Sequence, residues 1–204
     1  MSITKKIEVQ GIFPTPVYIT KLSRKFNETE MSLFKNFETI KNVGNLSTKE
    51  NYILNNKNLL NLKKQLLSMT QDYCNNIICI KNVKPVITQS WLNYTKENEY
   101  HHKHNHSNSY VSGVLYIDVD ENNNKIYFYK NKFETIKPEV KEYNCFNSDT
   151  WFFPVKNYQV ILFPSSLEHS VETKLSKNTR ISLAFNIFLK GTLGSKLNLN
   201  ELKI

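Results

Sequence analysis

The stretch Arg180-Ile-Ser-Leu-Ala-Phe-Asn-Ile187 carries the clearest structural pattern in the chain. Apolar side chains at positions 181, 183, 185 and 187 alternate with the arginine and with small or polar residues. Because successive side chains of a β-strand point to opposite faces, this alternation predicts a strand over Thr179–Leu189. One face of that strand is apolar. The other is small and polar apart from Arg180, which suits a face that lines a cavity.

The chain from residue 85 onward consists of short apolar segments separated by turn residues. Further strands are predicted at Val86–Tyr94, Val111–Asp118, Ile126–Tyr129, Trp151–Val155 and Tyr158–Phe163. Strands of this length at such intervals are typical of a β-sandwich or barrel. We therefore expect the core of the fold within residues 85–204.

Residues 1–84 have a different character. Ile12–Ile19 reads as an extended strand whose two prolines confine it to a sheet edge. Asn27 with Glu30 three residues on predicts a capped helix. A longer amphipathic helix, ending near Cys79, is indicated by apolar residues at Leu62, Leu66, Met69, Tyr73 and Ile77. Both helices are expected to buttress the outside of a sheet.

The size of the chain favours one domain over residues 1–204. A chain of 204 residues and 24.0 kDa is long enough for a sizeable core and too short for two comfortable domains. No apolar stretch approaches the roughly 20 residues that a membrane span needs. The first eight residues lack the apolar segment of a signal peptide, and the three cysteines are an odd, scattered set. These features predict a cytoplasmic protein with reduced thiols.

The net charge of +9 raises the question of an acidic partner. The lysines are spread along the chain, and no basic block is interleaved with aromatic residues, so nucleic acid is not indicated although it is not excluded. A small-molecule or peptide substrate is expected instead. Unpaired strand edges leave a homodimer open.

All five histidines fall in two places, the run His101–His106 and the single His169. His104 and His106 are two positions apart, so in extended structure both imidazoles point to the same side and could bind one metal ion. Imidazole suits iron, zinc or copper. His169 begins a strand after an apolar run and a turn, where a third ligand could converge. The alternative is that the histidine run is a solvated loop.

An arginine on an inward strand face needs a partner, because an unpaired buried charge is very costly. The partner of Arg180 is either a protein carboxylate or the carboxylate of a ligand, held bidentately by the guanidinium fork. Ser182 lies two residues on and faces the same way, which favours the ligand.

Three blocks in this order, His104–Tyr116, Leu162–Val171 and Arg180–Asn186, together resemble the 2-oxoglutarate/Fe(II) oxygenases of bacteria and phages, distant relatives of the prolyl hydroxylases. Ile12–Val17 and Ser90–Asn93 are similar to the opening and the first core strand of that family. The resemblance implies a mainly β fold with flanking N-terminal helices, namely a double-stranded β-helix, which is a jelly-roll or cupin-like barrel.

The resemblance also implies that His104, His106 and His169 bind Fe(II). The wider superfamily has a carboxylate at the position of His106. Either this subgroup uses three histidines, which we favour, or Asp118 or Asp120 reaches in. His101 and His102 are expected to be dispensable.

In the same family, Arg180 with Ser182 would hold the distal carboxylate of 2-oxoglutarate. Tyr116 and Asn93 are further candidates for the cofactor pocket, although core packing or sheet hydrogen bonding explains each equally well. The implied reaction consumes molecular oxygen and 2-oxoglutarate, hydroxylates a C–H bond and releases succinate and carbon dioxide. The kinship with prolyl hydroxylases favours a peptidyl or free amino-acid substrate such as proline.

Two other classes of protein remain open from the sequence. A cupin-like three-histidine metalloenzyme would share the barrel and the histidines but would not use 2-oxoglutarate. In a non-catalytic β-sandwich, for binding or as part of a virion, the histidine run would be a loop without a role in catalysis.

Overall fold

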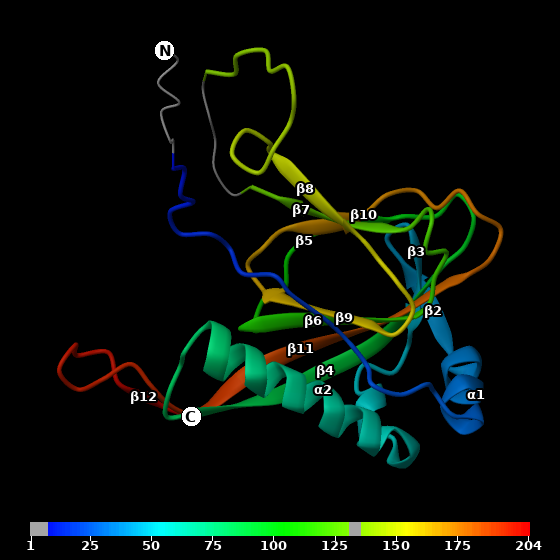
Figure 1. The fold of residues 1–204 in the computed structure, drawn as a ribbon. Helices are drawn as coiled ribbons and strands as arrows, with labels where there is room; N and C mark the ends of the chain where they lie inside the picture. Colours follow the sequence, from blue (N-terminus) through cyan, green and yellow to red (C-terminus); the bar gives the residue numbers. More distant parts are fainter. Residues whose placement is uncertain (1–7, 131–135) are drawn as a thin grey trace.

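A computed structural model describes residues 8–130 and 136–204. The signal-peptide prediction concerns the first eight residues, and seven of these lie outside the described residues. The strands pair into two sheets that face each other (Figure 1). The larger sheet has the order β1-β9-β6-β11-β4-β3-β2, with β12 paired to β11, and the smaller has the order β5-β10-β7-β8. The strands are β1 Tyr18–Lys21, β2 Thr39–Asn42, β3 Asn45–Thr48, β4 Val83–Thr95, β5 His101–His104, β6 Val111–Asp118, β7 Lys125–Tyr129, β8 Thr150–Pro154, β9 Gln159–Pro164, β10 His169–Val171, β11 Arg180–Leu193 and β12 Leu202–Lys203.

From β4 to β11 the chain passes back and forth between the two sheets. Strands β4, β6, β9 and β11 belong to the larger sheet, and β5, β7, β8 and β10 to the smaller. All the pairings between these strands are antiparallel. This is the double-stranded β-helix expected from the sequence, and the mainly β fold class is confirmed.

The helices precede the barrel strands and cover one side of it. Helix α1 spans Glu28–Asn36 and begins with the predicted capping box between Asn27 and Glu30. Helix α2 spans Leu60–Asp72 and continues as a π-helix over Tyr73–Ile77. Two short 3-10 helices, Ile53–Asn55 and Lys57–Leu59, lead into α2. Figure 1 shows α2 lying across the outer face of the larger sheet, as expected for a buttress.

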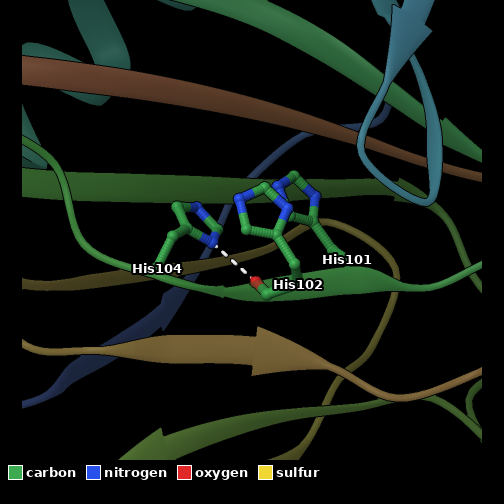
Figure 2. Close-up of side chains that lie close together, drawn as sticks. All are labelled: His101, His102 and His104. Atoms are coloured by element: carbon green, nitrogen blue, oxygen red, sulfur yellow. Dashed lines mark hydrogen bonds between the residues drawn. The ribbon is translucent and has the colours of Figure 1, made fainter.

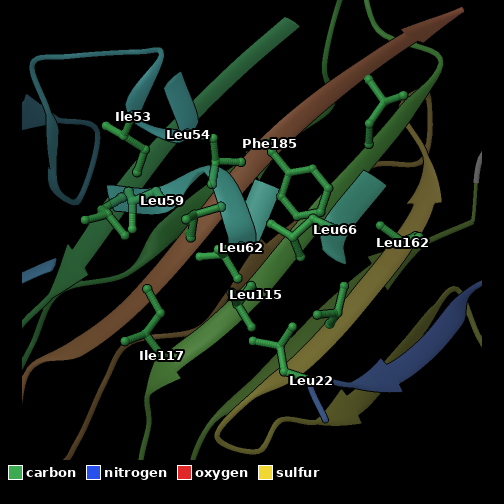
Figure 3. Close-up of a cluster of buried hydrophobic side chains, with 14 of the residues drawn as sticks. Leu22, Ile53, Leu54, Leu59, Leu62, Leu66, Leu115, Ile117, Leu162 and Phe185 are labelled. Atoms are coloured by element: carbon green, nitrogen blue, oxygen red, sulfur yellow. The ribbon is translucent and has the colours of Figure 1, made fainter. Parts of the chain in front are cut away.

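The main hydrophobic core fills the space between α2 and the larger sheet. Leu62 and Leu66 of α2 are fully buried there, together with Leu115 of β6 and Phe185 of β11 (Figure 3). The apolar face predicted for the strand from residue 180 is therefore the face that contacts the helix. A second cluster, which includes Phe128 and Tyr116, lies between the two sheets.

The predicted strands agree closely with the structure from residue 83 onward, where Val111–Asp118 has the bounds of β6. The opening strand is shorter than predicted, because pairing begins only at Tyr18, after both prolines, and β1 lies at a sheet edge. The sequence did not predict the β2–β3 hairpin. Among the described residues no helix is long and apolar enough to cross a membrane.

Gly113 provides a test of the packing in this core. It lies opposite Phe185 on the neighbouring strand, and a Cβ at Gly113 would lie 2.2 Å from Cζ of that ring. We expect Gly113→Ala to lower the free energy of unfolding by about 1–3 kcal/mol, because the ring must move in a filled core. Urea denaturation measures this. Gly11→Ala is the matched control, since its Cβ would meet nothing within 4 Å.

Candidate active site

A cavity lies between the sheets, and the larger sheet supplies its floor with rows of side chains that cross β4, β11 and β6. One row pairs Ser182 with Asn93 on one side and with Tyr116 on the other. The next row pairs Ala184 with Trp91 and Val114. All of these residues line the cavity, as do Arg180 and Ser112. The polar face predicted for the strand from residue 180 therefore does line a cavity.

The smaller sheet brings three histidines together above this floor. His104 of β5 pairs directly with His169 of β10, and His106 follows β5 by two residues. Nε2 of His106 lies 3.4 Å from Nε2 of His169. One ring nitrogen from each of the three lies within 4.8 Å of the others, and in the described part of the chain no carboxylate joins this group. The Asp118 and Asp120 alternative thus finds no support in the geometry.

Hydrogen bonds to backbone carbonyls orient two of these rings. Nδ1 of His104 donates to the carbonyl of His102 over 2.7 Å, and Nδ1 of His169 donates to the carbonyl of Leu167 over 3.0 Å. Each bond places the proton on Nδ1, so the lone pair of a neutral ring is on Nε2. Two imidazole nitrogens about 2.1 Å from one metal ion could lie about as far apart as Nε2 of His106 and Nε2 of His169. The residues therefore fit a metal ion.

Burial keeps these imidazoles neutral. It lowers the pKa of His106 to about 4, with His104 adding to the effect, and lowers the pKa of His169 well below its usual value. The pKa of His104 is also lowered by burial. A neutral imidazole is the form that binds a metal, so the cluster is ready for one at neutral pH.

The lowered pKa values predict acid sensitivity of the metal-free protein. Histidine in an unfolded chain titrates near 6.5, whereas the folded protein resists protonating these rings. Stability is therefore fully present above about pH 6.5 and is lost as the pH falls toward about 4, because only the unfolded chain takes up protons. We expect the free energy of unfolding to fall by up to about 1.4 kcal/mol per pH unit for each such histidine. Urea denaturation between pH 7.5 and 4.5 measures this, and His106→Gln should flatten the slope. Stability that rises on acidification would contradict it.

Arg180 is buried, with 2% of its surface exposed, and it shares the cavity with the histidines. Its Nη2 donates to Oγ1 of Thr95 over 3.0 Å. Among residues 8–130 and 136–204 no carboxylate lies within 4 Å of its guanidinium. Burial lowers its pKa from the usual value. A buried cation without an anionic partner in the fold fits a carboxylate ligand.

The other predicted pocket residues lie at the same place. Ser182 and Asn93 are buried neighbours on adjacent strands, and Oδ1 of Asn93 has no hydrogen-bond partner among the described residues. Burial also raises the pKa of Tyr116, so its phenol stays protonated. An orphaned amide oxygen and a phenol facing one cavity fit a polar ligand there.

His101 also lines this cavity, which the sequence did not lead us to expect. The pairing of β10 with β5 changes register between His169 and Val171, and this bulge turns His101 inward although it lies three residues before His104. Figure 2 shows the rings of His101, His102 and His104 together, with the bond from His104 to the carbonyl of His102. The His101 ring stacks on that of His104, with centroids 4.6 Å apart, and burial lowers its pKa to about 3.

Trp91 is a second cavity residue that the prediction did not name. Its indole stacks on the ring of His106, with centroids 5.7 Å apart. A signal for it was present, because Trp91 lies two residues before Asn93 on a predicted strand and so shares its face.

The segment that carries these residues also matches a known sequence family. Residues 89–186, the segment from β4 to β11, match a protein family described as "Putative 2OG-Fe(II) oxygenase". The matched segment contains all seven predicted site residues. In sequence, no curated protein matches the chain.

Solved structures with the same fold include several proteins of this type. An oxidoreductase of the 2OG-Fe(II) oxygenase family from Burkholderia pseudomallei is 12% identical, with 83% of each chain covered and a TM-score of 0.57. HygX from Streptomyces hygroscopicus, with nickel, 2-oxoglutarate and hygromycin B bound, is 12% identical, with 85% of this chain and 82% of HygX covered and a TM-score of 0.59. The carbocyclase SnoK of nogalamycin biosynthesis is 9% identical, with 86% and 79% covered and a TM-score of 0.56. At these identities the likeness concerns the fold.

Proposed function

We propose that the chain belongs to the 2OG-Fe(II) oxygenase family, whose sequence model matches residues 89–186, and that it hydroxylates a C–H bond of a small molecule. The protein is an oxygenase that uses Fe(II) and 2-oxoglutarate. In the proposed reaction one oxygen atom of O2 enters the substrate as a hydroxyl group, and the other enters succinate as 2-oxoglutarate loses carbon dioxide. The iron and the co-substrate supply the oxidising chemistry when bound.

We assign the iron to His104, His106 and His169. The convergence of their nitrogen atoms and the burial that keeps the rings neutral support this assignment. The backbone bonds of His104 and His169 hold two of the rings with Nε2 free, so these ligands need little reorganisation on binding.

We assign the distal carboxylate of 2-oxoglutarate to Arg180, assisted by Ser182, with Tyr116 and Asn93 completing the pocket. The observation that carries the proposal is the buried guanidinium of Arg180, which has no carboxylate partner in the described fold yet lies in the same cavity as the histidines. This argues against a cupin-like enzyme without 2-oxoglutarate, in which the arginine would lack its ligand. Apolar side chains such as Phe163 line the same cavity.

For the substrate, we propose a small molecule that is not a peptide. HygX has been solved with hygromycin B and the epimerase SnoN with nogalamycin RO, neither of which is an amino acid. The expectation of a peptidyl or free amino-acid substrate rested on distant kinship with prolyl hydroxylases alone, and these structures with bound molecules give it no support.

The test is to load the purified protein anaerobically with Fe(II) and add 2-oxoglutarate. A visible metal-to-ligand charge-transfer band is expected, because the co-substrate chelates the metal through its keto acid end. Admission of oxygen should then yield succinate. A protein that holds iron but gives neither the band nor succinate would be a cupin-like metalloenzyme of another kind, and the proposal would be wrong.

A further inference from the structure

A buried hydrogen-bond network connects the β2–β3 hairpin to the cavity. Nδ2 of Asn45, the first residue of β3, lies 3.3 Å from Oγ1 of Thr95 and 3.2 Å from Nδ1 of His101. The same Thr95 oxygen accepts the hydrogen bond from Arg180. Asn45 is 4% exposed and Thr95 is fully buried. The hairpin lies outside residues 89–186, so the family match does not cover this residue.

The direction of the hydrogen bonds that Asn45 makes follows from a fifth residue, Asn42. Nδ2 of Asn42 donates to Oδ1 of Asn45 over 3.1 Å, which fixes the Asn45 amide with its NH2 group toward Thr95 and His101. An amide NH2 has two protons to donate and no lone pair to offer. Nδ1 of His101 must therefore accept, and the neutral ring carries its proton on Nε2.

His101 thus brings an N–H donor to a cavity that also contains the cation Arg180 and the hydroxyl group of Ser182. A carboxylate has about four lone-pair sites, of which a guanidinium fork fills two and one hydroxyl group a third. A further N–H donor would satisfy the fourth site. The buried network connects this donor to the arginine through Asn45 and Thr95.

We propose that Nε2 of His101 donates a hydrogen bond to the 2-oxoglutarate that Arg180 anchors, and that Asn45 is a positioning residue that sets the His101 tautomer. The proposal rests on the proposed function. It replaces the expectation that His101 is dispensable, and it makes the N-terminal hairpin a support for a residue of the co-substrate pocket.

The first experiment measures 2-oxoglutarate binding to the Ni(II)-loaded protein by calorimetry, and by Trp91 fluorescence in a Trp151→Phe background. Loss of one neutral hydrogen bond in His101→Phe should raise Kd about fivefold with metal content unchanged. His101→Gln should restore much of the affinity, because its amide nitrogen lies near the position of Nε2. His101→Asn, whose amide lies near Nδ1, should not. His102→Phe is the matched control, since the His102 side chain is not among the residues that line the cavity.

The second experiment observes the tautomer of the metal-free protein by 15N NMR of the imidazoles. Wild type should show the His101 proton on Nε2. Asn45→Asp replaces the amide donor by an acceptor and should move the proton to Nδ1. Asn45→Ala should raise Kd for 2-oxoglutarate but add less than about twofold in a His101→Phe background, because the two residues act in series. Thr39→Ala, on the same hairpin, should change neither quantity.

Unchanged Kd in His101→Phe, or a wild-type His101 proton on Nδ1, would overturn the proposal. Loss of metal in His101→Phe would also overturn it and would make His101 a metal ligand. Failure of the wild-type metal-loaded protein to bind 2-oxoglutarate would instead refute the proposed function on which this inference rests.

Discussion

Replacing His169 by alanine should leave a folded protein that no longer retains Fe(II). The proposed site has three protein ligands, and His169 is the most buried of them, with its Nε2 directly facing that of His106. Changing a residue that merely orients a ligand already costs about 10–100-fold in metal affinity, so loss of a ligand should cost more than about 100-fold. His104→Ala and His106→Ala should behave alike. Iron content after desalting gives the result, and a cooperative urea transition shows that the fold is intact.

A second group of histidines in this region could also bind a metal ion, and variants of that group distinguish the two sites. His101, His102 and His104 also place ring nitrogens within 4.8 Å of one another. His104 has only Nε2 free, so it cannot serve both groups at once. His102→Ala should therefore keep full iron occupancy. If His102→Ala lost the iron while His169→Ala kept it, the metal would belong to the other group and the assignment would fail.

Replacing His106 by aspartate tests whether the site accepts the carboxylate ligand of the wider superfamily. His106→Asp places there the ligand type that the superfamily uses at this position, and carboxylates are accepted by Fe(II) sites. We expect this variant to retain iron where His106→Ala loses it. Loss of iron in both would mean that the longer reach of the imidazole is required.

The barrel and the polar strand face that lines the cavity could be predicted because their side chains follow a period of two. Neighbouring side chains of a strand point to opposite faces, so Arg180 and Ser182 face the cavity while Ile181 and Leu183 face the helix. The alternation in the sequence of this one strand shows both faces. Tyr116 and Asn93 then follow by register on the neighbouring strands. An alternating sequence therefore predicts which face of the sheet a side chain occupies wherever the strand is regular.

The residues that could not be predicted lie where that regularity fails. His101 faces inward only because of the bulge opposite Ser170, and a bulge adds a residue without any mark in the local pattern. Asn45 contacts the cavity residue His101 from a hairpin of four-residue strands, in a chain where asparagine is common throughout. Its role depends on tertiary contacts with residues about 50 positions away, which one sequence does not reveal.

Arg180→Met should weaken 2-oxoglutarate binding and leave the ligand-free protein at least as stable as wild type. A charge-assisted bidentate contact to a carboxylate contributes roughly 1.5–3 kcal/mol, so Kd should rise by at least about tenfold, with Fe(II) binding little changed. Ser182→Ala should act more weakly, through one neutral hydrogen bond worth about 1 kcal/mol. Calorimetric titration of the metal-loaded protein gives both values.

The stability of the same variant separates a ligand anchor from a structural partner. The chain has two arginines, of which Arg24 has a carboxylate partner and Arg180 has none among the described residues. Arg24 forms a 2.6 Å ion pair with the buried carboxylate of Glu30, so Arg24→Met should lower the free energy of unfolding by about 1–3 kcal/mol without affecting 2-oxoglutarate. Arg180 has no such partner in the described fold, and an apolar side chain removes a desolvation cost that only the ligand offsets. If Arg180→Met destabilised the ligand-free protein as Arg24→Met does, and 2-oxoglutarate bound normally, the arginine would belong to the architecture of the barrel rather than to its co-substrate.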